Sequence, residues 1–285
     1  MHETLLLCTD MDRTVIPNGA QAEHPDARRR FRQFCQSDNV CLVYVTGRHR
    51  QLAEKAIRVY HLPQPDYVVS DVGTKIYQRQ DTRWQEVQSW CDEISVDWNG
   101  RSHHDIKQLL ADIKQLQLQE FSKQNTHKLS FYLPLYLDKD KVIQAVQQRL
   151  QHNHIRASVI WSVDELTQIG LLDVLPENAT KLHAIEFLRD KLGVADSQLV
   201  FAGDSGNDMA VLASAIQSVL VNNASDDIKS LAQRLAAENG HSQSLYLATN
   251  PDPLGMNGNY SAGVLQGVWH YLPELRHQLE KGEHA

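Results

Sequence analysis

Short apolar runs recur along the chain, and each ends in a polar or glycine-containing turn: LLLCTD, VCLVYVTG, YVVSD, LVFAGD and VLVNN. Stretches with helical spacing lie between most of them, such as Leu182, Ile185, Leu188 and Leu192. Continuous apolar strands that alternate with helices predict an α/β fold, with a parallel sheet covered on both faces. Ligands of such sheets collect at the carboxyl ends of the strands, so the polar residues after these runs are the first candidates for a site.

The middle of the chain has a different pattern. From about residue 102 it predicts a helix, strands at QLQE and HKLSFYLPLYLD, a second helix, and strands at IRASVIWS and QIGLLDVLP. A repeated helix-strand-strand unit predicts a small antiparallel sheet with two helices on one face. We therefore expect an inserted α+β cap domain, in the order αββαββ, at residues 86–174. The parallel-sheet core is expected at residues 1–85 and 175–285.

Composition narrows the possible partners. The 285 residues carry a formal net charge of -7, so no overall positive field draws the protein to nucleic acid or to an anionic membrane. The apolar run at the amino terminus is too short for a signal peptide, and no stretch approaches the length of a membrane span. Four cysteines without CxxC spacing fit a reducing, cytoplasmic setting. We expect a monomer or a weak dimer.

Two groups of aspartates follow predicted buried strands. Asp10 and Asp12 come directly after LLLCT, and Asp204 and Asp208 come after LVFAG. A D-x-D pair alone is also typical of a helix cap or a surface turn. Four acids at two neighbouring strand ends, however, repel one another unless a divalent cation lies among them, and hard oxygen ligands suit Mg²⁺. The sequence therefore predicts a magnesium site.

Three further residues are candidates to hold an anionic group. Lys181 opens the helix after PENAT, although a lone lysine is most often a surface residue. Thr46 and Gly47 end the second apolar run, where a hydroxyl and free backbone N–H groups can bind phosphate oxygens at a helix start. A plain strand-to-helix turn would have the same sequence.

In order, DMDRT, VTGR, a lysine at a helix start and GDSGND resemble the four motifs of the haloacid dehalogenase superfamily of aspartate-nucleophile phosphatases. The position of the cap, between the second and third motifs, resembles the branch that contains sucrose-phosphate phosphatase and the Cof-type sugar phosphatases. HKLSFYL, GLLDVLP and NGNYSAGVLQGVWHY are similar to the sucrose-phosphate phosphatase group in particular. Arg13 and Val15 depart from that group, and the loop at residues 255–261 has no role that the motifs assign.

The resemblance implies a set of roles. Asp10 attacks phosphorus and forms an aspartyl-phosphate, and Asp12 protonates the leaving alkoxide and later takes a proton from water. The implied metal ligands are Asp10, Asp12 through its backbone carbonyl, Asp204 and Asp208. The groups implied to hold the phosphoryl oxygens are Thr46, Gly47, Asn207 and Lys181. Because acids outnumber cations here, we expect Asp12 to carry a proton when substrate binds.

Substrate-binding candidates lie at strand ends and in the cap. Lys128 and Ser130 alternate with apolar residues, so one face of their strand is polar; sugar hydroxyls need such groups, but an exposed strand face looks the same. The full set of substrate candidates is Arg48, Asp71, Gly73, Lys128, Ser130 and Asp173.

Together these features predict a Rossmann-like core with a cap, and a Mg²⁺-dependent phosphatase for a small-molecule sugar phosphate. Sucrose 6-phosphate or a related disaccharide phosphate is the preferred substrate. Two alternatives stay open from the sequence. One is a phosphotransferase or phosphomutase of the same superfamily, and the other is a non-catalytic sugar-phosphate-binding protein.

Overall fold

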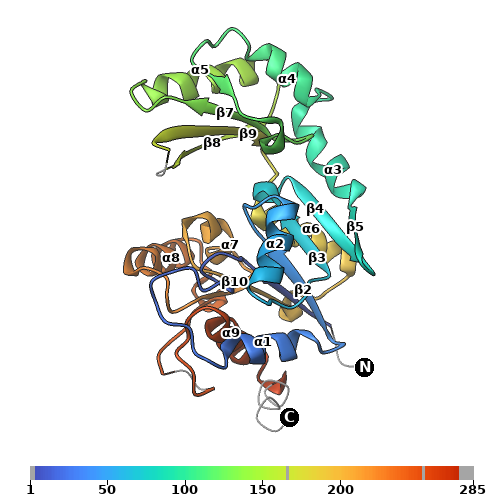
Figure 1. Cartoon of the computed structure of the whole chain (residues 1–285), viewed down its shortest axis with the longest axis vertical. Coiled ribbons are helices and arrows are strands. Elements are labelled where there is room, and N and C mark those ends of the chain that lie inside the picture. The colour runs from blue at the N-terminus through green and yellow to red at the C-terminus, as the bar shows by residue number, and fades with distance from the viewer. Residues whose placement is uncertain (1–3, 165–166, 252–253, 276–285) are drawn as a thin grey trace. The chain divides into compact units, whose positions relative to one another are not determined.

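The computed structural model describes residues 4–164, 167–251 and 254–275. The chain forms two compact units (Figure 1). The first joins Met1–Glu86 to Lys181–Ala285, and the second is Val87–Thr180. Among the described residues, no helix combines the length and the apolar composition that a membrane span requires.

The first unit is built on an eight-stranded sheet in the order β12-β11-β10-β1-β2-β3-β4-β5. Neighbouring strands run parallel from β12 to β3, and β4 and β5 are antiparallel. The strands are β1 (Leu5–Thr9), β2 (Val40–Val45), β3 (Tyr67–Ser70), β4 (Lys75–Gln80), β5 (Arg83–Glu86), β10 (Leu199–Gly203), β11 (Gln217–Leu220) and β12 (Leu245–Leu247).

Helices cover this sheet because its central strands are apolar on both faces. Leu5 and Leu7 of β1 pack into one core with residues of α1, α2 and α9, and the alternate residues Leu6 and Cys8 are buried as well. The helices are α1 (Ala27–Cys35), α2 (Arg50–Val59), α6 (Lys181–Leu192), α7 (Met209–Leu212), α8 (Asp226–Glu238) and α9 (Ser261–Tyr271). Short 3-10 turns are η1 (Asp71–Gly73), η4 (Asp196–Gln198), η5 (Gly206–Asp208), η6 (Ser242–Ser244) and η7 (Pro273–Leu275).

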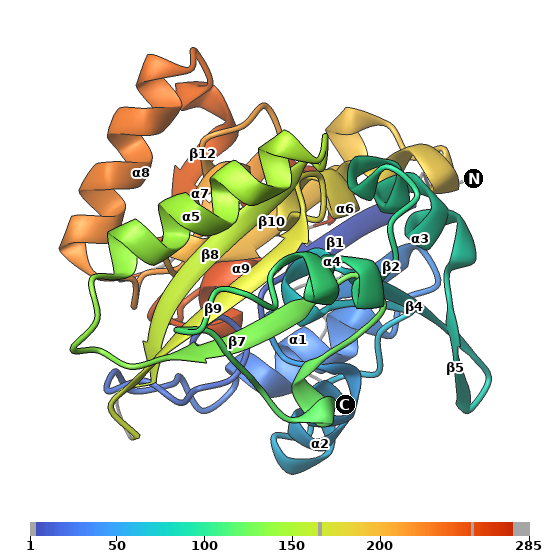
Figure 2. The same cartoon turned by 90° about the horizontal axis from the view of Figure 1, so that it is seen from above.

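The second unit has an antiparallel sheet in the order β6-β7-β9-β8. Its elements are α3 (Gln88–Ser95), η2 (Val96–Trp98), α4 (His103–Leu109), β6 (Gln117–Leu118), η3 (Phe121–Lys123), β7 (Leu129–Leu133), α5 (Lys139–His152), β8 (Ala157–Asp164) and β9 (Ile169–Pro176). α4 and α5 lie over the same face of this sheet (Figure 2), where Ile106 and Val146 share a core with Phe131 and Leu172. The predicted αββαββ order is confirmed, preceded by α3.

The antiparallel hairpin of β4 and β5 is the main element that the apolar pattern did not predict. Its sequences, KIYQRQ and RWQE, are mostly polar, and most of its residues are partly or fully exposed because the hairpin lies at the edge of the sheet. The α/β fold with a mostly parallel core sheet is confirmed. β9 continues to Pro176, so residues 175–180 belong to the second unit in the structure.

Candidate active site

The carboxyl ends of four adjacent strands carry the predicted site residues. Asp204 follows β10, Asp10 follows β1, Thr46 follows β2 and Asp71 follows β3, and these strands are neighbours in the order β10-β1-β2-β3. A pocket of about 430 Å³ opens here, entirely within the first unit. It is lined by Asp10, Asp12, Arg13, Thr46, Gly47, Arg48, Asp204, Ser205, Gly206, Asn207, Ser225 and Ile228.

Three carboxyl groups meet in this region. Asp10, Asp204 and Asp208 are buried, and one oxygen of each lies within 4.8 Å of the others. Burial, opposed in part by the charge of Lys181, raises the pKa of Asp10 to about 7. Burial and the neighbouring Asp208 carboxylate raise the pKa of Asp204 to about 6. Near neutral pH, the negative charge of the three carboxyl groups is therefore larger than the positive charge of the side chains around them.

Lys181 supplies part of the missing positive charge. Its ammonium group is buried and donates to Asp10 Oδ1 at 2.6 Å, to Asp208 Oδ1 at 2.7 Å and to Asn207 Oδ1 at 3.3 Å. Burial works to lower the pKa of Lys181, but the charges of Asp10 and Asp208 outweigh it, so the pKa is raised and the side chain stays cationic. Lys181 begins α6, which brings a residue distant in sequence to the end of β1.

The three carboxylates fit a hard divalent cation. Their oxygens are close together, and Mg²⁺ prefers oxygen ligands with room for water, which the adjoining pocket offers. Asp208 is fixed for such a role, because its Oδ2 accepts from the amides of Asp204 and Ser205, each at 3.2 Å. Of the four acids that the sequence predicted around Mg²⁺, Asp10, Asp204 and Asp208 thus lie together. The carboxylate of Asp12 lies outside this cluster.

Asp12 makes a different set of contacts. Arg48 Nε donates to Asp12 Oδ2 at 2.7 Å, and Asn18 Nδ2 donates to Asp12 Oδ1 at 2.8 Å. Partial burial works to raise the pKa of Asp12, but the hydrogen bond and charge of Arg48 outweigh it and the pKa is lowered. Without substrate, therefore, Asp12 is ionised and paired, whereas the sequence analysis expected it to be protonated once substrate is bound.

The predicted phosphate-binding residues line the same pocket. The hydroxyl of Thr46 accepts from the amide of Arg48 at 3.2 Å, which shapes the turn after β2. A Cβ atom on Gly47 would have no other atom within 4 Å, so the backbone here is open to a ligand. Asn207 Oδ1 accepts from Ser205 Oγ at 2.9 Å and from Lys181. Each of these groups is thus placed beside the carboxylate cluster.

Comparison with known proteins identifies the family. The model of the family described as sucrose-6F-phosphate phosphohydrolase matches residues 3–272. The chain belongs to this family. A protein of Nitrosococcus oceani called a putative HAD-like hydrolase is 51% identical over 99% of this chain and 76% of its own length. The resemblance to the haloacid dehalogenase superfamily is confirmed, and this member of the sucrose-phosphatase family is a phosphatase.

More distant relatives carry specific names. Mannosylfructose-phosphate phosphatase of Agrobacterium fabrum is 29% identical over 82% of this chain and 89% of its own length. Sucrose-phosphatase 2 of Nicotiana tabacum is 26% identical over 93% of this chain, which spans 59% of that relative. The structure of a Synechocystis sucrose-phosphatase with sucrose and phosphate has a TM-score of 0.69 at 24% identity, covering 94% of this chain and 98% of its own; it shows the fold.

The remaining substrate candidates fall into two places. Asp71 and Gly73 form η1 at the end of β3, and the Asp71 amide donates to the backbone oxygen of Arg48 at 3.0 Å. Lys128, Ser130 and Asp173 lie together in the second unit. Lys128 Nζ is 3.6 Å from Asp173 Oδ2, and Ser130 Oγ donates to Asp173 Oδ1. Ser130 is buried, so it does not belong to a freely exposed strand face.

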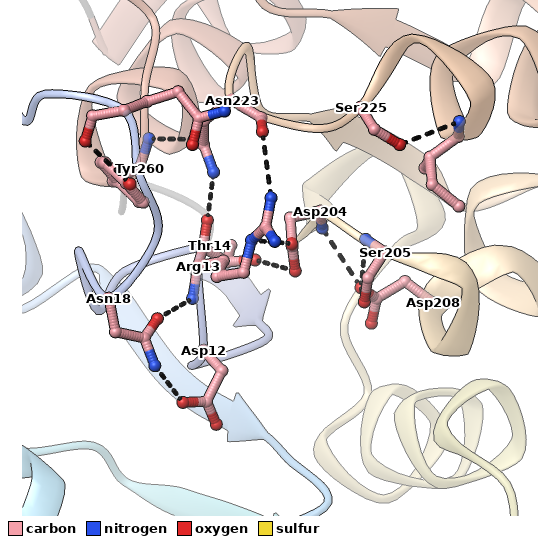
Figure 3. A network of polar contacts seen from close by, with 12 residues as sticks. Asp12, Arg13, Thr14, Asn18, Asp204, Ser205, Asp208, Asn223, Ser225 and Tyr260 are labelled. Carbon is pink, nitrogen blue, oxygen red and sulfur yellow. Dashed lines mark hydrogen bonds and ion pairs between the residues drawn. The ribbon is translucent and has the colours of Figure 1, made fainter. Parts of the chain in front are cut away.

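Several residues of the site were missed by the sequence analysis. Arg13 Nε lies 3.3 Å from Asp204 Oδ2 and Thr14 Oγ1 donates to Asp204 Oδ1 at 3.3 Å (Figure 3). Gly203 leaves room for the Asp208 side chain, since a Cβ atom there would be 2.7 Å from the Asp208 carboxyl carbon. Asn223 follows the run VLV, which completes β11 and extends one residue beyond it, so the strand-end rule that found Asp204 could have found it.

Proposed function

We propose that this family member hydrolyses a sugar phosphate through an aspartyl-phosphate on Asp10, with Mg²⁺ as cofactor. The observation that carries the proposal is the buried Asp10 carboxyl group, 2.6 Å from the Lys181 ammonium and clustered with Asp204 and Asp208. A nucleophilic carboxylate needs a fixed cation beside it and a place for the phosphate dianion. The pocket lined by Thr46 adjoins it and offers that place.

In the first step a carboxylate oxygen of Asp10 attacks phosphorus and the bond from phosphorus to the sugar oxygen breaks. The sugar alkoxide takes a proton from Asp12, since an alkoxide is too basic to leave unprotonated. Lys181 and Asn207 hold the phosphoryl oxygens as charge moves onto them, and the free backbone at Gly47 offers a further N–H group.

Asp12 can act as an acid only if Arg48 gives up its ion pair. A bound phosphate dianion competes for the guanidinium, because this planar group can donate to two phosphate oxygens at once. Loss of this pair lets the pKa of Asp12 rise, since partial burial is the largest influence on it and works in that direction. We propose this phosphate contact as the role of Arg48, which the sequence analysis named as a candidate to bind the substrate.

In the second step water attacks phosphorus of the aspartyl-phosphate and transfers a proton to Asp12. The bond from phosphorus to Asp10 breaks, which returns the carboxylate and releases inorganic phosphate. Bound Mg²⁺ supplies charge that offsets the carboxylates and the phosphate. Asp204 and Asp208 would hold it, together with Asp10 and the backbone carbonyl of Asp12.

Sucrose 6-phosphate or a related disaccharide phosphate is the proposed substrate. Support comes from the description of the family and from the names of the tobacco and Agrobacterium relatives. In the second unit, Lys128, Ser130 and Asp173 supply grouped donors and acceptors of the kind that sugar hydroxyls need. Asp71 and Gly73 are proposed to contribute from the end of β3.

A phosphate-release screen with Mg²⁺ tests this proposal. It compares sucrose 6-phosphate, mannosylfructose phosphate and hexose monophosphates, with Asp10→Asn as the inactive control. We expect the disaccharide phosphates to give the highest kcat/KM. Activity confined to hexose monophosphates would overturn the disaccharide assignment but leave the chemistry intact, whereas an active Asp10→Asn protein would overturn the chemistry.

Transfer to a second sugar is the main alternative reaction, because it shares the same covalent intermediate. Single-turnover reactions with substrate alone separate the two, since hydrolysis releases free phosphate and transfer does not. Family membership favours an enzyme over a non-catalytic binding protein. We further propose a cytoplasmic setting, consistent with Cys8, Cys35, Cys41 and Cys91, which are free thiols. That the protein is a monomer or a weak dimer stays a prediction, which a measurement of its molar mass by light scattering would test.

A further inference from the structure

The loop that begins at Asp12 has a strained backbone at its second residue. The φ angle of Arg13 is 58°, in the left-handed region that residues other than glycine rarely adopt. The amide of Arg13 donates to Ile16 O at 3.0 Å and to Asn18 Oδ1 at 2.9 Å. A strained residue persists only where its surroundings fix it, so the direction of the neighbouring Asp12 depends on what holds Arg13.

Asn223, in the turn after β11, holds the backbone of Arg13 in this conformation. Its side chain is buried, with 2% of its surface exposed, and its Nδ2 donates to the Arg13 carbonyl oxygen at 2.7 Å. The Arg13 guanidinium in turn donates to the backbone oxygen of Asn223 at 3.5 Å. Figure 3 shows the two residues facing each other beside Asp204. Two segments far apart in the sequence are therefore joined next to the carboxylate cluster.

The other end of the Asn223 amide is held by Tyr260. The Tyr260 amide donates to Asn223 Oδ1 at 2.7 Å, and Tyr260 itself has a φ of 51°, a second strained backbone. One side-chain amide thus bridges two strained positions. It has no freedom to rotate, because its donor and its acceptor each have a distinct partner.

The loop at residues 255–261 holds the far side of the Asp12 loop. The Tyr260 hydroxyl donates to Gln21 O at 2.9 Å, and the side chains of Asn257 and Asn259 each donate to Ala22 O at 3.0 Å. This asparagine-rich loop was the motif without a role in the sequence analysis. These three contacts lead to residues 21 and 22, just after Asn18, whose side chain donates to Asp12.

We infer that Asn223 is a positioning residue for Asp12, acting through the Arg13 backbone and anchored by Tyr260. The inference rests on the proposed role of Asp12 as general acid. Asn223 is not among the residues that line the pocket, so its effect on Asp12 passes through the Arg13 backbone. A misplacement of about 1 Å is enough to cost on the order of a hundred-fold in rate.

Asn223→Asp is the variant that isolates this contact. It keeps an oxygen to accept from the Tyr260 amide but has no donor for the Arg13 carbonyl. Gln266→Glu is the matched control: Gln266 is a fully buried amide of α9 that accepts from the Thr249 amide at 2.7 Å and donates to the Thr249 hydroxyl at 3.2 Å. Both changes turn a bridging amide into a carboxylate, and only the first touches the Asp12 loop.

The decisive activity readout is the dependence on the leaving group. p-Nitrophenyl phosphate leaves as a stable phenolate and needs little protonation, whereas glycerol 2-phosphate leaves as an alkoxide and depends on the acid. We expect Asn223→Asp to lower kcat/KM for glycerol 2-phosphate by about ten-fold more than for p-nitrophenyl phosphate. Equal losses on the two substrates would overturn the inference, as would the same selectivity in Gln266→Glu.

Backbone hydrogen exchange gives a second readout that needs neither metal nor substrate. In Asn223→Asp the peptide spanning residues 10–22 should exchange faster than in the wild-type protein, because the bonds that order Arg13 are weakened. Gln266→Glu should leave that peptide unchanged. Unchanged exchange in Asn223→Asp would overturn the inference. If the wild-type protein hydrolyses neither of these two phosphates, the exchange measurement alone decides whether Asn223 holds the loop. The proposed function fails only if the sugar phosphates of the screen are not hydrolysed either.

Discussion

Replacing Asp10 by asparagine removes a buried acid whose proton is linked to folding. Burial raises the pKa of this group from an ordinary 3.8 to about 7, with Lys181 offsetting part of the rise. An acid whose pKa is raised by folding binds its proton more tightly in the folded chain. Stability is therefore lost as pH rises from 3.8 towards 7, and the loss is complete above the folded value.

The size of the effect follows from the same two values. Between about pH 5 and pH 7 the unfolded chain has lost this proton and the folded chain still holds it, so each pH unit costs about 1.4 kcal/mol. Over that interval the wild-type protein should lose about 2 kcal/mol that Asp10→Asn does not lose, because the folded group is half deprotonated when the pH reaches its pKa. The titration of groups distant from Asp10 is common to the two proteins and cancels in the difference.

Urea unfolding of both proteins at the two pH values, with a chelator present, measures this difference. Added Mg²⁺ should then restore more stability to the wild-type protein than to the variant at the higher pH, because the cation offsets a charge that the variant lacks. A free-energy difference that does not change with pH would refute the reasoning. So would a wild-type protein that gains stability over Asp10→Asn as the pH rises.

Three further substitutions test other parts of the structure. Lys181→Met should lower kcat for p-nitrophenyl phosphate by about 10²–10³-fold in steady-state assays, because it removes the buried cation beside Asp10; activity within ten-fold of wild type would contradict that role. Gly203→Ala should abolish the Mg²⁺-dependent rise in Tm, since its methyl group would displace the Asp208 carboxyl group, and an unchanged rise would rule this out. Leu172→Ala should destabilise the second unit by about 2–5 kcal/mol in urea unfolding, while the kcat for p-nitrophenyl phosphate at low urea stays the same.

The sequence predicted the site residues whose positions follow from the path of the backbone alone. Asp10, Thr46 and Asp204 could be placed together because each follows an apolar run, and parallel strands bring their carboxyl ends to one edge. The order of elements in the second unit was also readable, because its strands alternate and its helices have a clear period. The local sequence pattern is sufficient to place a residue where burial determines the strand or helix and the residue lies at the end of that strand or helix.

Side-chain partners could not be predicted in the same way. The ion pair of Arg48 with Asp12 and the bridge from Asn223 to Arg13 each join different segments, and their geometry depends on how those segments pack. Polar residues leave no periodic signal that distinguishes a buried partner from a solvated one. The antiparallel hairpin of β4 and β5 was not predicted for a related reason, because strands at the edge of a sheet need no continuous apolar run.

The second unit is inserted between two segments that together form the large sheet, and this arrangement has an evolutionary consequence. All eight strands of that sheet come from the segments before Val87 and after Thr180, so none is contributed by the intervening residues. Recombination at these two points could exchange the intervening module without altering strand order or the buried aspartates. If the second unit binds the sugar, as proposed above, replacing this module would change the substrate and leave the aspartates that carry the proposed reaction in place.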